Sequence, residues 1–113
     1  MKILFLDDDV LRHEAFLREH PSDTVTRAST VEETLVALEA GSPFDVVYLD
    51  HDLEGRVFVE EIEGTGCEIA FFIARLPDNK LPKLVIVHSH NSAGARRMVE
   101  ALQGRVPVRH EPF

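Results

Sequence analysis

Three short apolar blocks, each of which turns polar at its C-terminal side, constrain the fold of this chain most strongly. The blocks and the residues that follow them are 3–6 with Asp7-Asp8-Asp9, 46–49 with Asp50-His51-Asp52, and 84–87 with His88-Ser89-His90-Asn91. An apolar run of this length with polar ends is typical of a strand buried in a parallel sheet. Ligands of open α/β sheets bind outside the carboxyl ends of the strands. The sequence therefore indicates where a site would lie before it indicates what that site does.

Helical patterns separate the apolar blocks and predict one α/β domain over residues 1–113. We expect strands over residues 2–6, 25–28, 46–49, 83–87 and 106–109, and helices over residues 10–19, 65–76 and 92–103. A further helix should start at the capping box of residues 30–33 and stop at Gly41. This alternation calls for a five-stranded parallel sheet with helices on both faces. The first helix would place Leu11, Ala15 and Phe16 against the sheet. Residues 53–64 are the least informative, and Val57–Val59 fits either a short strand or a loop edge.

The composition excludes several classes of function. The formal net charge is −8, which argues against a surface that binds nucleic acids broadly through their phosphates. No apolar stretch is long enough to span a bilayer, so we expect no membrane partner. The one cysteine, Cys67, rules out an internal disulfide and predicts a cytoplasmic location. A small phosphate ester, bridged to carboxylates by a metal ion, is compatible with these properties.

Two groups of carboxylates follow strands that the topology would place side by side. Side chains alternate along a strand, so Asp7, Asp8 and Asp9 cannot all point one way, and Asp9 is placed to cap the first helix. Two charges ~4 Å apart repel by about 4 kcal/mol at an effective dielectric constant near 20. Carboxylates that only cap helices and solvate loops are the plainer interpretation, but two adjacent groups favour a divalent metal site. Oxygen ligands suit Mg²⁺ or Mn²⁺, and the ligand candidates are Asp7, Asp8, Asp50 and Asp52.

A histidine pair, His88 and His90, leaves the fourth predicted strand. If the strand stays extended there, both imidazoles project to one side. Imidazole binds transition metals, including Zn²⁺, and also transfers protons near neutral pH. Ser89 and Asn91 lie beside the pair, at a helix N-terminus suited to phosphate. The simpler alternatives are that a histidine packs in the core and that Asn91 only caps the helix. His51, between two aspartates, is expected to point to the other face.

The chain resembles the receiver domains of two-component response regulators over nearly its whole length. The matching segments are residues 3–9, 45–50 and 81–87, and the closing Glu-Pro-Phe of residues 111–113 resembles the Lys-Pro-Phe that ends the fifth strand of receivers. The resemblance implies a flavodoxin-like fold. It also implies that Asp7 and Asp8 hold Mg²⁺. Asp50 would then occupy the place of the phosphoacceptor, and the backbone carbonyl of Asp52 would complete the metal shell.

Three departures separate the chain from signalling receivers. His88 stands near the place of a hydroxyl residue at the end of the fourth strand, with Ser89 one step later. Glu111 stands where receivers carry a lysine that stabilises the acyl phosphate, and a glutamate there would repel a phosphoryl group. The sequence ends at Phe113, so we expect the final receiver helix to be absent.

These departures are similar to those of another branch of the superfamily, the cyclic-phosphate-processing receiver-like domains. This resemblance rests on residues 49–53, 64–66 and 88–91, followed by Gly94-Ala95 and Met98. It implies action on the cyclic phosphate end of a nucleotide or RNA.

We therefore expect a metal-dependent enzyme that acts on a phosphoester. Asp8 and Asp50 would hold the metal, with Asp7 or Asp52 assisting. The catalytic candidates are Asp50, His88 and His90, and the phosphate-binding candidates are Asn91 and Ser89. The histidines would either complete the metal shell or transfer protons to the leaving oxygen. Two alternatives stay open: an atypical response-regulator receiver phosphorylated on Asp50, and a non-catalytic pseudo-receiver that binds a partner protein.

Overall fold

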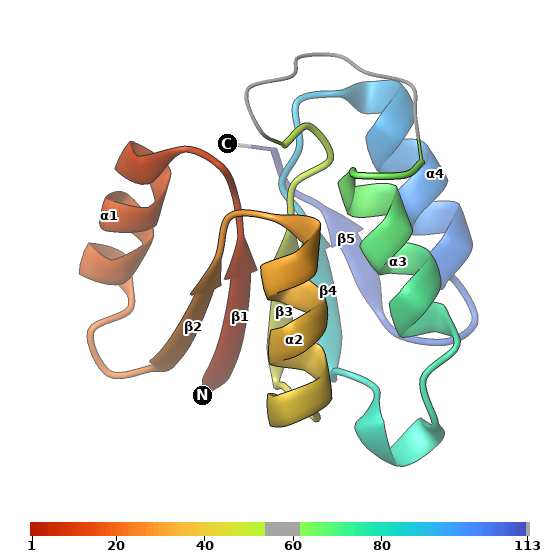
Figure 1. Ribbon diagram of the computed structural model, residues 1–113, viewed down its shortest axis with the longest axis horizontal. Helices are drawn as coiled ribbons and strands as arrows, with labels where there is room; N and C mark the ends of the chain where they lie inside the picture. The colour runs from red at the N-terminus through yellow and green to blue at the C-terminus, as the bar shows by residue number, and fades with distance from the viewer. Residues whose placement is uncertain (54–61, 113) are drawn as a thin grey trace.

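A five-stranded parallel sheet in the order β2-β1-β3-β4-β5 forms the centre of the fold (Figure 1). The computed structural model describes residues 1–53 and 62–112, so the predicted segment Val57–Val59 lies outside the described residues. The elements in chain order are β1 (Lys2–Leu6), α1 (Val10–Glu19), β2 (Thr24–Ala28), α2 (Val31–Gly41), β3 (Val46–Leu49), α3 (Gly66–Ala74), the 3₁₀ helix η1 (Asp78–Lys80), β4 (Leu84–Val87), α4 (Ser92–Leu102) and β5 (Val108–His110). This order confirms the predicted flavodoxin-like sheet.

The position of β1 within the sheet explains where a site can form. β1 lies between β2 and β3, so the chain runs outward from β1 to β2 and then crosses back over β1 to β3. Ile3 lies opposite Val46, and Val46 lies opposite Leu84, so β1, β3 and β4 run side by side in parallel. Their carboxyl ends therefore meet at one edge of the sheet, at the switch point where open α/β sheets bind ligands.

Helices cover both faces of the sheet, as predicted. On one face, α2, α3 and α4 bury apolar side chains against the strands, among them Leu38, Ile69, Ile73, Met98 and Leu102. On the other face α1 packs through Phe16 against Ile3, Phe5, Val46 and Ile86. Figure 1 shows α1 apart from the other three helices. Within residues 62–112 no helix follows β5.

Helix α1 buries a different stripe from the one predicted. Phe16 is buried, but Leu11 is 73% exposed, so the expectation that Leu11 faces the sheet is wrong. His13 takes the inward position instead and is 5% exposed. His13, Phe16 and His20 follow one another at helical spacing, and the ring of Phe16 contacts those of Phe5 and His20. An imidazole thus occupies a place that the pattern assigned to aliphatic residues.

Side-chain caps fix where the helices begin. Asp9 accepts hydrogen bonds from the backbone N–H groups of Leu11 and Arg12, which confirms the predicted cap of α1. Thr30 and Thr65 cap α2 and α3 in the same way. These caps satisfy N–H groups that have no partner within the helix. None of the helices in the described ranges has the length and apolar character needed to cross a membrane.

Candidate functional site

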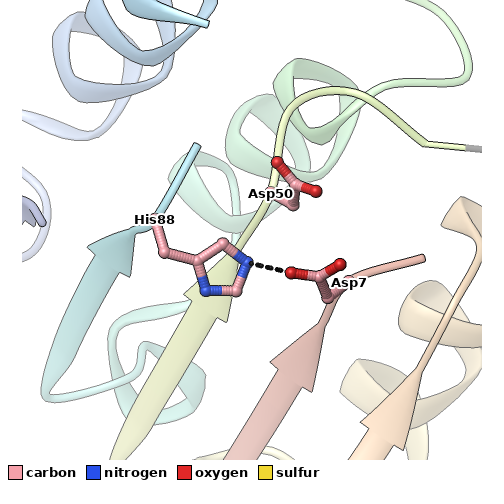
Figure 2. A group of neighbouring side chains, drawn as sticks. All are labelled: Asp7, Asp50 and His88. Atoms are coloured by element: carbon pink, nitrogen blue, oxygen red, sulfur yellow. Dashed lines mark ion pairs between the residues drawn. The ribbon is translucent and has the colours of Figure 1, made fainter. Parts of the chain in front are cut away.

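Three buried side chains from three adjacent strands meet at the carboxyl edge of the sheet (Figure 2). Asp7, Asp50 and His88 each stand directly after the last residue of β1, β3 and β4. One potential ligand atom from each residue lies within 4.8 Å of the others. The three residues are 0%, 5% and 2% exposed, respectively. The strand register therefore assembles a compact polar group at the end of an apolar sheet.

His88 is held as a neutral hydrogen-bond donor. Its Nε2 lies 3.0 Å from the Leu6 carbonyl oxygen and 3.3 Å from Oδ2 of Asp7. A carbonyl oxygen only accepts, so Nε2 carries the proton. Burial, opposed by the bond to the Leu6 carbonyl, lowers the pKa of His88 to about 3. The imidazole is therefore uncharged at neutral pH and ties β4 to the end of β1.

Asp50 is a carboxyl group that titrates near neutral pH. Burial, and then the charges of Asp7 and Asp8, raise the pKa of Asp50 to about 7, against the opposing effect of Arg12. The pKa of Asp7 is also raised, mainly by burial. Two buried carboxylates beside a third acidic residue are costly when all are ionised. The site therefore favours either a bound proton or an added cation.

Arg12 is the residue of this site that the sequence did not predict. Its Nη1 lies 3.4 Å from Oδ2 of Asp7 and 3.8 Å from Oδ2 of Asp50. Its Nε lies 3.8 Å from Oδ2 of Asp9. The cap at Asp9 sets the phase of α1, so that position 12, three residues on, turns back toward the acidic loop. In the sequence, the one feature that could have predicted this position is an arginine one helical turn after an acidic N-cap residue.

The three aspartates of the acidic run have different environments and different roles. Asp7 is buried and its Oδ1 accepts a hydrogen bond from the Asp9 backbone N–H at 2.8 Å. Asp9 caps α1. Asp8 is partly exposed, and its charge acts on both Asp7 and Asp50. Asp7 thus points into the site, and Asp8 lies close enough to raise the cost of ionising its neighbours.

A second polar network, from His51, Asp52 and Asn91, joins the β3 end to the start of α4. Nδ1 of His51 lies 2.8 Å from Oδ1 of Asp52, and Nδ2 of Asn91 donates to the same oxygen at 3.1 Å. Oδ1 of Asn91 accepts from the Gly94 N–H, so Asn91 is also the cap of α4. The His51 ring is fully buried, and a Cβ at Gly94 would lie 2.5 Å from it. His51 is thus built into the fold beside Asp50.

The structure separates His88 from His90. β4 ends at Val87, so the alternation of a strand does not extend to residue 90. His88 is buried and His90 is exposed. The expectation that both imidazoles point to one side is therefore not met. Ser89 is buried between them, and its Oγ accepts a hydrogen bond from the Asn91 backbone N–H at 3.0 Å.

Gly66, the first residue of α3, packs closely against the backbone of Asp50. A Cβ on Gly66 would lie 2.0 Å from the Asp50 carbonyl oxygen, so only glycine allows α3 to begin this close to the end of β3. The Gly66 N–H donates to the His51 carbonyl at 3.0 Å. Gly66, which the sequence offered only as part of a resemblance, thus has a steric reason.

Glu111 follows the end of β5, and its side chain pairs with that of Arg109 in the same strand. The Arg109 Nε lies 3.3 Å from Oε2 of Glu111, and both side chains are more than half exposed, at 60% and 51%. The Glu111 backbone N–H donates to the Val87 carbonyl. Residue 111, which the resemblance to receivers matched to a lysine, therefore carries an exposed carboxylate paired with an arginine.

The donor set fits a divalent cation. Asp7 and Asp50 offer carboxylate oxygens, the ligands that Mg²⁺ and Mn²⁺ prefer, and Asp8 adds charge beside them. The raised pKa of Asp50 shows that the buried carboxylates lack sufficient compensation from Arg12 alone. His88 could act as a ligand only in the other tautomer, because its Nε2 now donates to Leu6. The fit to a hard cation therefore rests on the two carboxylates.

Comparison with known proteins agrees with this geometry. Residues 2–104 match the model of the family described as the cyclic-phosphate processing receiver domain. No curated protein matches the chain.

Solved structures with a similar fold include response regulators. The Mn²⁺-bound form of response regulator Rcp1 is 17% identical, with 99% of this chain and 81% of that chain covered and a TM-score of 0.68. The CheY-like receiver domain protein of Methanospirillum hungatei JF-1 is 21% identical, with 98% and 81% covered and a TM-score of 0.63. The N-terminal domain of a response regulator/sensory box/GGDEF protein of Carboxydothermus hydrogenoformans is 18% identical, with 99% and 80% covered and a TM-score of 0.65. At these identities the likeness shows the fold alone.

Proposed function

This chain belongs to the cyclic-phosphate processing receiver domain family, and from that premise we propose that it is a metal-dependent enzyme acting on a phosphoester such as a nucleotide cyclic phosphate. The proposed site is the group formed by Asp7, Asp50 and His88. The observation that carries the proposal is the burial of two carboxylates and an imidazole within 4.8 Å of one another at the switch point of the sheet. Such a group is costly without a cation or a proton.

Asp7 and Asp50 are the residues that would hold the cation, with Asp8 beside them. Mg²⁺ or Mn²⁺ suits these oxygens, and Zn²⁺ would require His88 as a ligand. When bound, the cation supplies charge neutralisation for the phosphate and for the negative charge that develops during phosphoester cleavage. The Mn²⁺-bound form of Rcp1, which has the same fold, supports this choice of metals.

Asp50 is the residue best suited to exchange a proton during the reaction. Hydrolysis of a cyclic phosphate adds water to phosphorus and breaks one ring P–O bond, and the freed oxygen takes up a proton. A carboxyl group with a pKa of about 7 is populated in both protonation states near neutral pH. His88, with a pKa of about 3, is instead neutral there, and its Nε2 stays hydrogen-bonded to the Leu6 carbonyl, 3.3 Å from Oδ2 of Asp7.

The substrate phosphate would lie between the carboxylates and the N-terminus of α4. Backbone N–H groups at a helix start favour anions. Asn91 and Ser89 fix this helix start through their hydrogen bonds to Gly94 and to the Asn91 N–H. His90 is exposed at the same loop and is the second candidate for proton transfer.

A second candidate function is that of a receiver phosphorylated on Asp50. The position of Asp50 directly after β3, in a sheet shared with response-regulator receivers, favours it. The exposed Glu111 and its pairing with Arg109 argue against it, because no lysine is there to stabilise an acyl phosphate. Partner binding without chemistry is the third alternative, and a buried group of titrating carboxylates serves no purpose in it.

The proposal is tested by thermal melting together with a phosphoester screen. Melting temperature is measured in chelator and in saturating Mg²⁺ or Mn²⁺, because a ligand that binds only the folded state raises it. Turnover is measured on nucleoside 2′,3′-cyclic phosphates and on linear phosphoesters. We expect metal to raise the melting temperature of the wild type and to support turnover. Asp50→Asn should reduce both effects.

The control is Asp78→Asn, which makes the same change in charge at an aspartate that is 90% exposed. It should leave the metal response and turnover unchanged. Identical melting in chelator and in metal would exclude the metal site. Inactivity of the metal-loaded wild type on every cyclic and linear phosphoester would exclude the enzyme and leave the binding alternatives.

A further inference from the structure

A cavity lies beside the start of α1, next to the acidic loop. It has a volume of about 470 Å³ and is lined by Val10, His13, Arg27, Ser29 and Glu33. These residues come from the first turns of α1 and α2 and from the end of β2. Because β2 pairs with β1, the cavity opens at the same carboxyl edge of the sheet that carries Asp7. A cavity of this volume is within the range of small-molecule sites, roughly 300–1,000 Å³.

His13 joins the cavity to the candidate site. Its Nε2 lies 2.7 Å from the Asp7 carbonyl oxygen, and because a carbonyl only accepts, Nε2 is the donor of this bond. His13 is 5% exposed, and its Nδ1 is buried with no hydrogen-bond partner among residues 1–53 and 62–112. A buried polar atom normally has a partner. The ring of His13 lines the cavity and thus carries an unsatisfied polar atom close to the cavity wall.

The other walls combine opposite charges with one apolar surface. Oε1 of Glu33 accepts a hydrogen bond from the Ser29 backbone N–H, which fixes the carboxylate at the cavity. Arg27 is exposed and supplies a planar cation. Val10 is apolar and 68% exposed. A bare phosphate suits Arg27 but is repelled by Glu33. A ring system that carries both donors and acceptors matches the whole set.

We propose that this cavity binds the nucleoside part of the phosphoester whose phosphate is processed at Asp7, Asp50 and His88. The proposal rests on the proposed function, and it names the substrate class as nucleoside phosphates. Arg27 would stack on or hydrogen-bond the base, Glu33 would accept hydrogen bonds from amino or ribose hydroxyl groups, and the His13 ring would form part of the wall. His13 would then sense the nucleoside on one side and hold the loop of Asp7 on the other.

Nucleoside binding is measured without chemistry, by titrating adenosine, guanosine, cytidine and uridine into the full chain in chelator. Amide NMR shifts report the site of binding. We expect at least one nucleoside to shift the amide resonances of residues 10, 13, 27, 29 and 33. Absence of any shift at these residues with all four nucleosides and their 2′,3′-cyclic phosphates, at millimolar concentration, would overturn the proposal.

The variant test compares Arg27→Ala with Arg18→Ala. Arg18 is an exposed arginine in the last turn of α1, at the opposite end of the helix from the cavity, and matches the change in charge. Arg27→Ala should weaken nucleoside binding about tenfold or more, as loss of a charged contact commonly does, while Arg18→Ala should not. On a nucleoside cyclic phosphate, Arg27→Ala should raise KM and leave kcat nearly unchanged. Equal binding by both variants would contradict the assignment.

Different results would exclude the metal-dependent enzyme and the nucleoside-binding cavity. Turnover of bis(4-nitrophenyl) phosphate by the wild type tests the metal site alone, because this ester has no nucleoside. Metal binding and turnover of this ester without nucleoside binding would overturn the cavity proposal only. Nucleoside binding at residues 10, 13, 27, 29 and 33 without metal binding or turnover would overturn the proposed enzyme. In that case the cavity would stand as a nucleoside-binding site.

Discussion

Nε2 of His88 lies 3.3 Å from Oδ2 of Asp7, and this contact joins the ends of β4 and β1 across the end of β3. The same region holds Asp50, whose pKa is raised to about 7 by burial and by neighbouring acidic residues. Burial lowers the pKa of His88 to about 3. An imidazole and a carboxyl group that would form an ion pair in water are thus both favoured in their neutral forms inside the protein when no cation is bound.

Because these pKa shifts have opposite directions, their effects on the free energy of unfolding should nearly cancel between about pH 4 and 6.5. Asp50 and His88 together should therefore add little pH dependence to wild-type stability in chelator. The raised pKa of Asp50 contributes stability that is present below its unfolded pKa and is lost as pH rises through about 7. The lowered pKa of His88 contributes stability that is present above its unfolded pKa and is lost as pH falls toward about 3. Each contribution has a slope of about 1.4 kcal/mol per pH unit, with opposite sign.

Single variants should reveal the two slopes. In chelator, the free energy of unfolding of Asp50→Asn should increase relative to that of the wild type as pH rises from about 4 to 7. The free energy of unfolding of His88→Gln should decrease relative to that of the wild type as pH rises from about 3 to 6.5. Urea unfolding at several pH values measures both differences. Parallel curves for the wild type and the two variants would show that neither group is perturbed as described.

Metal affinity should depend on the protonation of Asp50. A ligating carboxyl group must be ionised, so Mn²⁺ affinity in the wild type should rise about tenfold per pH unit below pH 7 and level off above it. Electron paramagnetic resonance of free Mn²⁺ measures this directly. Asp78→Asn should keep the same profile, and Asp50→Asn should lose it. A wild-type affinity that is constant from pH 5.5 to about 8.5 would contradict a role for Asp50.

Arg12 should compete with the metal for the same carboxylates, since its Nη1 approaches both Asp7 and Asp50. Arg12→Ala should lower stability in chelator by about 1 kcal/mol, because the carboxylates lose a partly exposed cation. It should also raise Mn²⁺ affinity about tenfold at high pH, where Asp50 is ionised. Calorimetric titration of Arg12→Ala and of Arg18→Ala as the control measures this. Weaker Mn²⁺ binding in Arg12→Ala would instead show that Arg12 supports the metal site.

The order of elements could be predicted from the sequence because apolar blocks and caps are local signals. Asp9 and Thr30 marked two helix starts correctly, and the polar ends of β1, β3 and β4 marked the edge where Asp7, Asp50 and His88 meet. β5 begins two residues later than predicted, after Pro107, which has no N–H to pair in a sheet.

The contacts around the site could not be predicted, because they depend on three-dimensional packing. Arg12 and His13 looked like ordinary helix residues until the phase of α1 turned both toward the loop of Asp7. The spacing gave no sign that His51 would be buried against Gly94 and lie within hydrogen-bond distance of Asn91 and Asp52. A backbone that leaves the strand geometry after Val87 likewise separates His88 from His90 in a way that residue spacing does not reveal.

A phosphodonor should leave no stable phosphoryl group on Asp50. Asp50 is 5% exposed and partly protonated at neutral pH, which weakens it as a nucleophile. Glu111, paired with Arg109, cannot stabilise a phosphoryl oxygen. Intact-mass measurement after incubation with acetyl phosphate and Mg²⁺ tests this, with a signalling receiver as the positive control. A stoichiometric, long-lived adduct on Asp50 would support the receiver alternative.

Gly66→Ala should destabilise the protein and weaken metal binding together. Alanine is favoured over glycine within a helix by about 1 kcal/mol, so helix propensity alone predicts stabilisation. The added Cβ, however, would lie 2.0 Å from the Asp50 carbonyl oxygen, and the backbone of either α3 or the β3 end must move. We expect a net loss of about 2 kcal/mol or more in urea unfolding, with Mn²⁺ affinity reduced because Asp50 moves.

The matched control is Gly104→Ala. Gly104 has φ of +84°, and a Cβ added there would meet no atom within 4 Å, so alanine at this position is strained without a clash. It should cost about 1 kcal/mol and leave Mn²⁺ affinity unchanged, because Gly104 lies after α4, far along the chain from the acidic loop. A metal affinity that falls only in Gly66→Ala ties the position of Asp50 to the start of α3. Equal metal affinities in the two variants would show that the carboxylate tolerates displacement of its backbone.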